Sequence, residues 1–137
     1  MNPALHLKIA GVLLLVLAAA HGAFGKRFNW EQDLAKLSLL NRQIFYVHCV
    51  FIVLVLAMFG ALSLFGTGAL LTPSPLARAV LAGLVIFWTA RLYVQFFVYD
   101  RRLWKGNVFN TRMHLLFSLL WTYYVAVYAN ALWWQYH

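Results

Sequence analysis

Four long apolar segments alternate with shorter polar ones along the chain, at about residues 5–24, 44–65, 76–98 and 113–132. Each has about 20 residues, the length that a helix needs to cross a hydrocarbon layer roughly 30 Å thick. Helices are expected for spans of this length, because a helix satisfies its backbone hydrogen bonds internally in lipid. The pattern therefore predicts an all-α, integral membrane four-helix bundle that forms a single transmembrane domain over residues 1–137.

The polar segments between the spans contain residues that typically begin helices. Ser74 followed by Pro75 predicts an N-cap with proline in the first turn, at the start of the third helix. Asn110 or Thr111 is expected to cap the fourth helix.

The first connection is too long for a simple turn. Trp30, Leu34 and Leu37 recur at helical spacing within residues 30–41, and Asn29 is expected to cap the helix that they predict. We expect a short interfacial amphipathic helix in this loop, which serves as an anchor on the membrane or as a lid over a site.

Basic residues gather at one set of span ends, in the first and third connections: Lys26, Arg27, Lys36, Arg42, Arg101, Arg102, Lys105 and Arg112. The opposite ends carry only Lys8 and Arg78. The excess of positive charge in cytoplasmic loops then places both termini on the non-cytoplasmic side, and a bacterial inner membrane is the expected location. Trp30 and Trp104 are expected at the inner interface, and Trp133 at the outer one.

The first segment also has the basic start, short apolar run and small-residue end of a signal peptide. Its removal would leave three spans and put Lys26 and Arg27 on the face opposite the cytoplasm, against the charge asymmetry. The segment is therefore expected to be retained as the first span.

Composition narrows the possible functions further. The chain is 64% hydrophobic and only 10% charged, so a soluble catalytic module has no room beside the spans. The net charge is +8, but the basic residues flank apolar segments and do not form one long polar stripe. This distribution argues against nucleic acid as a partner. The single Cys49 excludes an internal disulfide and a thiolate cluster.

Several polar residues lie inside the predicted spans, toward the basic ends. At 1.5 Å per residue, His21 lies roughly 7 Å from Lys26, and Gln95 lies roughly 7 Å from Asp100. Ionisable residues in a membrane usually face the protein interior or a cavity, although Arg91 alone could extend its side chain to the interface.

Helical spacing places these residues on single helix faces. The third span carries a stripe formed by Trp88, Arg91, Gln95 and Tyr99. The fourth span carries a similar stripe formed by His114, Ser118 and Thr122. The sequence therefore predicts a cytoplasmic-leaflet site built from His21, His48, His114, Arg91, Gln95 and Tyr99.

Two kinds of cofactor would suit such a site. Two of His21, His48 and His114 could ligate the iron of heme b across the bundle, with Arg91 or Arg101 near the propionates. The three imidazoles could instead hold one transition metal. Either cofactor would make the protein a membrane oxidoreductase in quinone-linked or lipid-linked chemistry, although no catalytic residue is identified.

Two other functions need no metal. Arg91, Gln95 and the histidines could bind a quinone or an anionic lipid headgroup through hydrogen bonds. The polar layer could also lock helix packing in a non-catalytic subunit or assembly partner of a larger membrane complex, or in a homo-oligomer.

Overall fold

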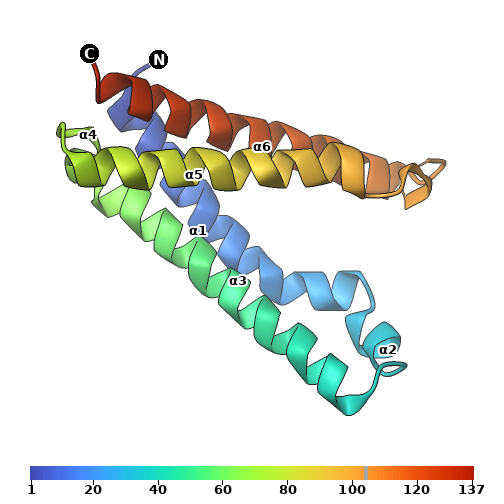
Figure 1. Ribbon diagram of the computed structural model, residues 1–137. Coiled ribbons are helices and arrows are strands. Elements are labelled where there is room, and N and C mark those ends of the chain that lie inside the picture. Colours follow the sequence, from blue (N-terminus) through green and yellow to red (C-terminus); the bar gives the residue numbers. More distant parts are fainter. Residues whose placement is uncertain (104) are drawn as a thin grey trace. The chain divides into compact units, whose positions relative to one another are not determined.

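The computed structural model describes residues 1–103 and 105–137, without the Arg101 side chain. Every regular element in these residues is helical (Figure 1). Four helices are long and apolar enough to cross a membrane: α1 (Pro3–Arg27), α3 (Leu39–Phe65), α5 (Pro75–Tyr93) together with its continuation η1 (Val94–Val98), and α6 (Val108–Trp134). The prediction of four such helices is confirmed. The expected interfacial position of Trp104 and the expected role of the Arg101 side chain lie outside the described part.

Two compact units make up the chain. Unit 1 contains Met1–Leu7 and Gly68–His137, and unit 2 contains Lys8–Thr67. The short helix α4 (Thr67–Leu71) lies at the boundary in sequence.

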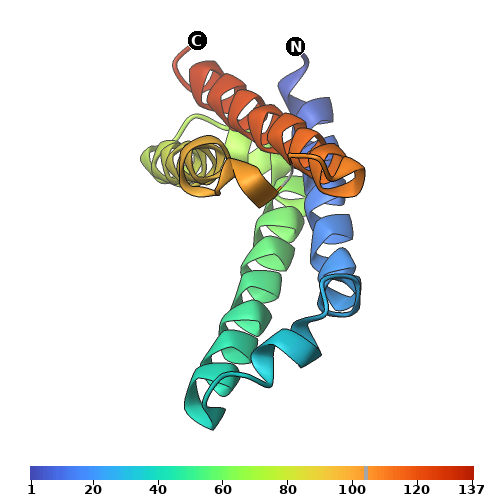
Figure 2. The ribbon, with the colours of Figure 1, turned by 90° about the vertical axis from the view of Figure 1, so that its right-hand side faces the viewer.

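In unit 2, α1 and α3 pack backbone to backbone at a pair of glycines (Figures 1 and 2). A Cβ atom added to Gly11 would lie 2.8 Å from the Gly60 carbonyl oxygen, and one added to Gly60 would lie 2.9 Å from the Gly11 carbonyl oxygen. No side chain larger than hydrogen fits at this crossing without moving a helix. Further along α1, a Cβ atom added to Gly22 would have no described atom within 4 Å, so the close packing at Gly11 does not extend to this glycine.

The first connection differs from the predicted continuous helix over residues 30–41. Only α2 (Trp30–Leu34) forms there, after Asn29 in a left-handed conformation with φ of 57°. Asn29 stands at the N-cap, but its side chain makes no capping hydrogen bond among the described residues. A new helix, α3, then begins at Leu39 because the Ser38 side chain accepts a hydrogen bond from the Asn41 N–H (3.2 Å).

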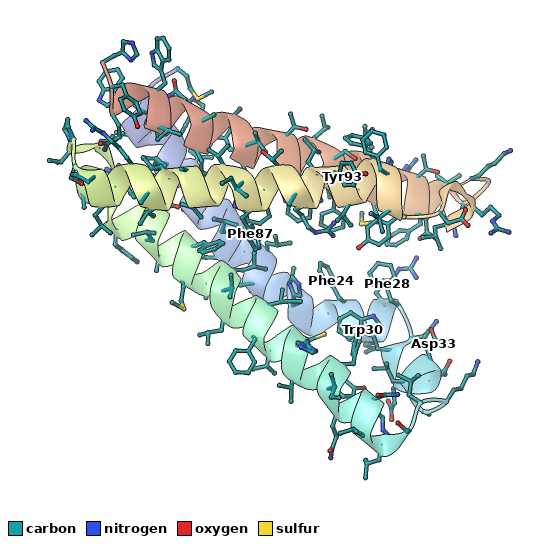
Figure 3. All side chains as sticks on the ribbon, in the orientation of Figure 1. Phe24, Phe28, Trp30, Asp33, Phe87 and Tyr93 are labelled. Atoms are coloured by element: carbon teal, nitrogen blue, oxygen red, sulfur yellow. The ribbon has the colours of Figure 1, made fainter. Side chains whose placement is uncertain are left out.

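Within unit 2, aromatic side chains fasten this connection to α1 and α3. The Trp30 ring lies edge-on to Phe45, with 5.0 Å between centroids, and also covers Gly25. Phe24 and Phe28 lie edge to face at 6.1 Å, at the same end of unit 2 as Trp30 (Figure 3). The connection is thus held by ring packing rather than by a long amphipathic helix.

In unit 1, α5 packs against α6 (Figures 1 and 2). As predicted, Ser74 caps α5 by accepting from the Ala77 N–H (3.0 Å), and Pro75 occupies the first turn. The predicted cap of α6 is wrong: Asn107, after Gly106 with φ of 78°, accepts from the Asn110 N–H and the helix begins at Val108. The Asn110 side chain instead donates to the Leu103 carbonyl (2.7 Å).

Gln135 fastens the end of α6 to the connection between α4 and α5. Its buried amide oxygen accepts from the Ser74 N–H (3.0 Å), and its nitrogen donates to the carbonyls of Leu70 (2.5 Å) and Thr72 (2.9 Å). One side chain therefore satisfies three backbone groups that no helix pairs.

Candidate functional site

The last turn of the α5 span widens into a π-helix, η1, and this turn carries Gln95. The wide turn ends where the Tyr99 N–H bonds to the Val94 carbonyl (3.3 Å). Gln95 is 4% exposed, so its amide is buried in unit 1. Single π-helical turns within α-helices are rare and occur frequently at functional sites.

The Gln95 amide joins η1 to α6. Trp121 donates its indole N–H to Gln95 Oε1 (3.3 Å), and Gln95 Nε2 lies 2.9 Å from His114 Nδ1. An indole nitrogen can only donate, so Trp121 identifies the Gln95 oxygen as the acceptor and leaves Nε2 to donate to His114. Neutral His114 must then accept at Nδ1 and carry its proton on Nε2.

This tautomer bears on the predicted role of His114. A histidine that ligates a metal through Nε2 carries its proton on Nδ1, the nitrogen that accepts here. The arrangement in unit 1 therefore favours His114 as a hydrogen-bonding residue over His114 as a metal ligand.

Arg91, on the last turn of α5, lies beside this chain of hydrogen bonds. Its Nη2 donates to the Tyr99 hydroxyl (3.3 Å), which confirms that these two predicted residues come together. Its Cζ lies 5.1 Å from the Trp121 ring centroid and 5.6 Å from the Tyr99 ring centroid. Contacts of this kind attract a cation to the faces of aromatic rings.

Arg91 has no carboxylate partner in the described part of unit 1. The sequence has three acidic residues, and of these only Asp100 belongs to unit 1. Asp100 bonds instead to Arg102, with 2.7 Å between Oδ2 and Nη2, and the Arg102 guanidinium holds the pKa of Asp100 below its ordinary value. Arg91 Nη1 is buried and has no hydrogen-bond partner among the described residues.

Aromatic rings surround Trp121 on both helices. Trp88 of α5 stacks on Trp121, with 5.2 Å between centroids and 17° between planes, and Phe117 lies nearly parallel to Trp121 at 5.5 Å. Tyr124, one turn further along α6, contacts Trp88 at 4.7 Å. These rings, of Trp88, Phe117, Trp121 and Tyr124, form an aromatic wall beside Arg91.

Of the stripe that was predicted on α6, only His114 takes part in the site. His114 joins the site, but the Ser118 hydroxyl donates to the His114 carbonyl (2.6 Å) and the Thr122 hydroxyl donates to the Ser118 carbonyl (2.7 Å). Hydroxyls that bond to their own helix are satisfied locally. The face that meets α5 is instead aromatic, and sequence analysis missed Trp121 and Tyr124 although they follow His114 at seven and ten residues.

His21 and His48 belong to unit 2, on α1 and α3. His21 Nδ1 lies 2.8 Å from the Leu17 carbonyl, and its ring lies 4.7 Å from Phe24. His48 is exposed. Within the described ranges, no three His, Cys, Asp or Glu side chains form a group that could hold a metal, so the three-histidine metal site has no structural support.

Sequence analysis also missed His6, which is near the N-terminus but lies within α1. Its Nδ1 is 2.7 Å from the Tyr123 hydroxyl, and the two rings lie at 5.8 Å. This pair ties the start of α1 to α6 inside unit 1.

Comparisons with protein-family models, curated proteins and solved structures found no match to the chain. The roles assigned to individual residues therefore rest on the geometry of the chain itself.

Proposed function

We propose that unit 1 binds an anionic amphiphile of the bilayer, with Arg91 as the residue that recognises its headgroup. The observation that carries this proposal is the buried Arg91 Nη1, which has no partner in the described part of the chain. Arg91 as a whole is partly exposed, but its buried Nη1 meets neither solvent nor an acceptor, and a guanidinium keeps its charge at all accessible pH values, so an unpaired buried N–H of this group is costly. A phosphate or carboxylate oxygen would supply the missing partner.

The surroundings of Arg91 support binding rather than a purely structural role. The Tyr99 hydroxyl and the Trp121 ring both contact the guanidinium. The Trp121 ring is itself oriented by its hydrogen bond to Gln95, which also bonds to His114. A cation that is already oriented loses little conformational freedom when an anion binds.

The membrane orientation in this proposal follows the basic connections. Both termini lie outside the cytoplasm, and the span ends near Arg91 lie in the cytoplasmic leaflet of a bacterial inner membrane. The basic residues of the connection that follows the α5 span, Arg102 and Lys105 among them, would attract acidic headgroups to the same leaflet. A quinone, whose carbonyls are uncharged acceptors, is the competing amphiphile.

A second proposal, heme b or a transition metal in unit 2, is supported by the state of His21. The Leu17 carbonyl can only accept, so a neutral His21 carries its proton on Nδ1 and has its lone pair on Nε2, as in histidines that ligate metals. His48 would be the other candidate ligand. A Soret band or bound metal that disappears in His21→Ala and persists in His114→Gln would support this proposal, and colourless, metal-free protein from iron-replete cells would contradict it.

The headgroup proposal is tested by titrating the purified protein in neutral detergent with dioleoyl phosphatidylglycerol and counting bound lipids by native mass spectrometry. Arg91→Gln should weaken binding by about 10- to 100-fold, because hydrogen bonds to a charged group contribute about 1.5–3 kcal/mol each. Lys8→Gln, which removes an exposed lysine at the opposite set of span ends, is the matched control and should leave affinity within about twofold. Equal affinity of folded Arg91→Gln and wild type would overturn the proposal.

A further inference from the structure

Two polar groups in the aromatic wall of unit 1 have no hydrogen-bond partner in the described part of the chain. Trp88 and Tyr124 are 1% and 0% exposed, and their rings are 4.7 Å apart. Neither the Trp88 indole nitrogen nor the Tyr124 hydroxyl has a hydrogen-bond partner among the described residues. A buried polar group without a partner is rare in proteins and calls for an explanation such as a bound molecule.

The chemistry of the two groups indicates what could bind between them. The indole N–H can only donate, and the phenol can donate its O–H. A single oxygen with two lone pairs can accept from both groups. Since neither group is charged, an uncharged carbonyl or a water molecule is the matching acceptor.

The position of these donors relative to Arg91 favours a carbonyl. Trp88 precedes Arg91 by three residues on α5, which is about 4.5 Å of helix rise, and it lies further from the end of the span. Both residues contact the same Trp121 ring, at 5.2 Å for Trp88 and 5.1 Å for Arg91. The position that suits a charged oxygen, at Arg91, therefore lies nearer the end of the span. The position that suits an uncharged oxygen, at Trp88 and Tyr124, lies nearer its middle.

An acyl phospholipid carries its oxygens in this order, with the phosphate outermost, the ester carbonyl next and the acyl chain beyond. We propose that Trp88 and Tyr124 bind the ester carbonyl of the amphiphile whose phosphate Arg91 recognises, so that unit 1 selects acyl-ester lipids. This inference rests on the proposed function and adds a selectivity that headgroup recognition alone does not require.

The test compares dioleoyl phosphatidylglycerol with its dioleyl ether analogue, which has the same headgroup and chains but no carbonyl. Wild-type protein in neutral detergent should bind the ester about tenfold more tightly than the ether, because the ether leaves both donors without a carbonyl partner. Tyr124→Phe removes only a hydroxyl and should reduce this ratio to about two. Trp88→Phe should also reduce it, while Tyr46→Phe, at an exposed position on α3, should not.

The outcomes separate the two proposals. Equal affinity of wild type for ester and ether, with Arg91→Gln still defective toward both, would overturn carbonyl recognition and leave headgroup recognition intact. In that case, a lower thermal stability of lipid-free Tyr124→Phe than of lipid-free wild type would show that the Tyr124 hydroxyl has a partner without lipid. The acceptor for the two donors would then be a water molecule. An unchanged ester-to-ether ratio in Tyr124→Phe would likewise overturn the inference, even if Trp88→Phe failed to fold.

Discussion

Gln95 is the residue on which the geometry of unit 1 depends most. It occupies a turn that is π-helical, and its amide accepts from Trp121 while it donates to His114. Leucine has a similar volume but offers no hydrogen bonds, so it would leave the buried Trp121 indole N–H without its acceptor and remove the Gln95 donor to His114.

We predict that Gln95→Leu lowers the stability of the protein by about 1–3 kcal/mol, the cost of leaving buried polar groups unpaired. Thermal unfolding in detergent, followed by circular dichroism, measures the change. Gln43→Leu, at an exposed position on α3, should change stability by less than about 0.5 kcal/mol. If Gln95→Leu were as stable as wild type, the hydrogen bonds of Gln95 would not hold η1 against α6.

At the residue scale, the sequence predicted some of this site and missed the rest for identifiable reasons. The spacing of Arg91, Gln95 and Tyr99 predicted that they lie near one another. Arg91 bonds to Tyr99 and contacts Trp121, which also bonds to Gln95, although Tyr99 itself lies past the end of the helix in an extended conformation. Trp121 was missed because an aromatic residue in an apolar span looks like any other lipid-facing or packing residue. The π-helical turn has no recognisable sequence signal, yet it determines where the Gln95 amide points.

The helical elements meet differently in the two units, and this difference predicts which substitutions they tolerate. In unit 1, aromatic rings and side-chain amides join α5 to α6. In unit 2, α1 and α3 approach so closely that the backbones touch at Gly11 and Gly60. Small residues of this kind are typical where helices pack in membranes.

We predict that Gly11→Ala destabilises unit 2 by about 1–3 kcal/mol, because its Cβ atom would collide with the α3 backbone and force the helices apart. Gly22→Ala provides the control on the same helix. Its Cβ atom meets no described neighbour within 4 Å, so alanine should be neutral or stabilise the helix by up to about 1 kcal/mol. Thermal unfolding of the two variants in parallel tests the crossing, and equal stability would contradict it.

Helix boundaries were predictable where local chemistry decides them. Ser74 and Pro75 begin α5 as expected, since a hydroxyl cap followed by proline needs no tertiary contact. The start of α3 at Leu39 was missed because the leucines before Ile44 resemble the apolar face of an interfacial helix. The Ser38 cap decides between these two structures, and it is visible only once the backbone turn is known.

At the scale of the whole molecule, hydrophobic length alone predicted four helices that can cross a membrane. The function of the chain was less accessible to sequence, because polar residues in one predicted layer need not meet. His114 lies in unit 1 with Arg91, Gln95 and Tyr99, and His21 and His48 lie in unit 2, so a site that joins the three histidines stays a prediction from sequence. Interaction with further membrane subunits or with copies of the chain stays a prediction from sequence.

The central claim is that Arg91 binds the headgroup of an acidic lipid, and the lipid that co-purifies with the protein tests it most directly. Wild type and Arg91→Gln, extracted in parallel from the same host membranes in a neutral detergent, are analysed by mass spectrometry for bound phospholipid per protein. We expect wild type to retain about one acidic phospholipid that Arg91→Gln loses. Equal amounts of acidic lipid on both folded proteins would contradict the claim.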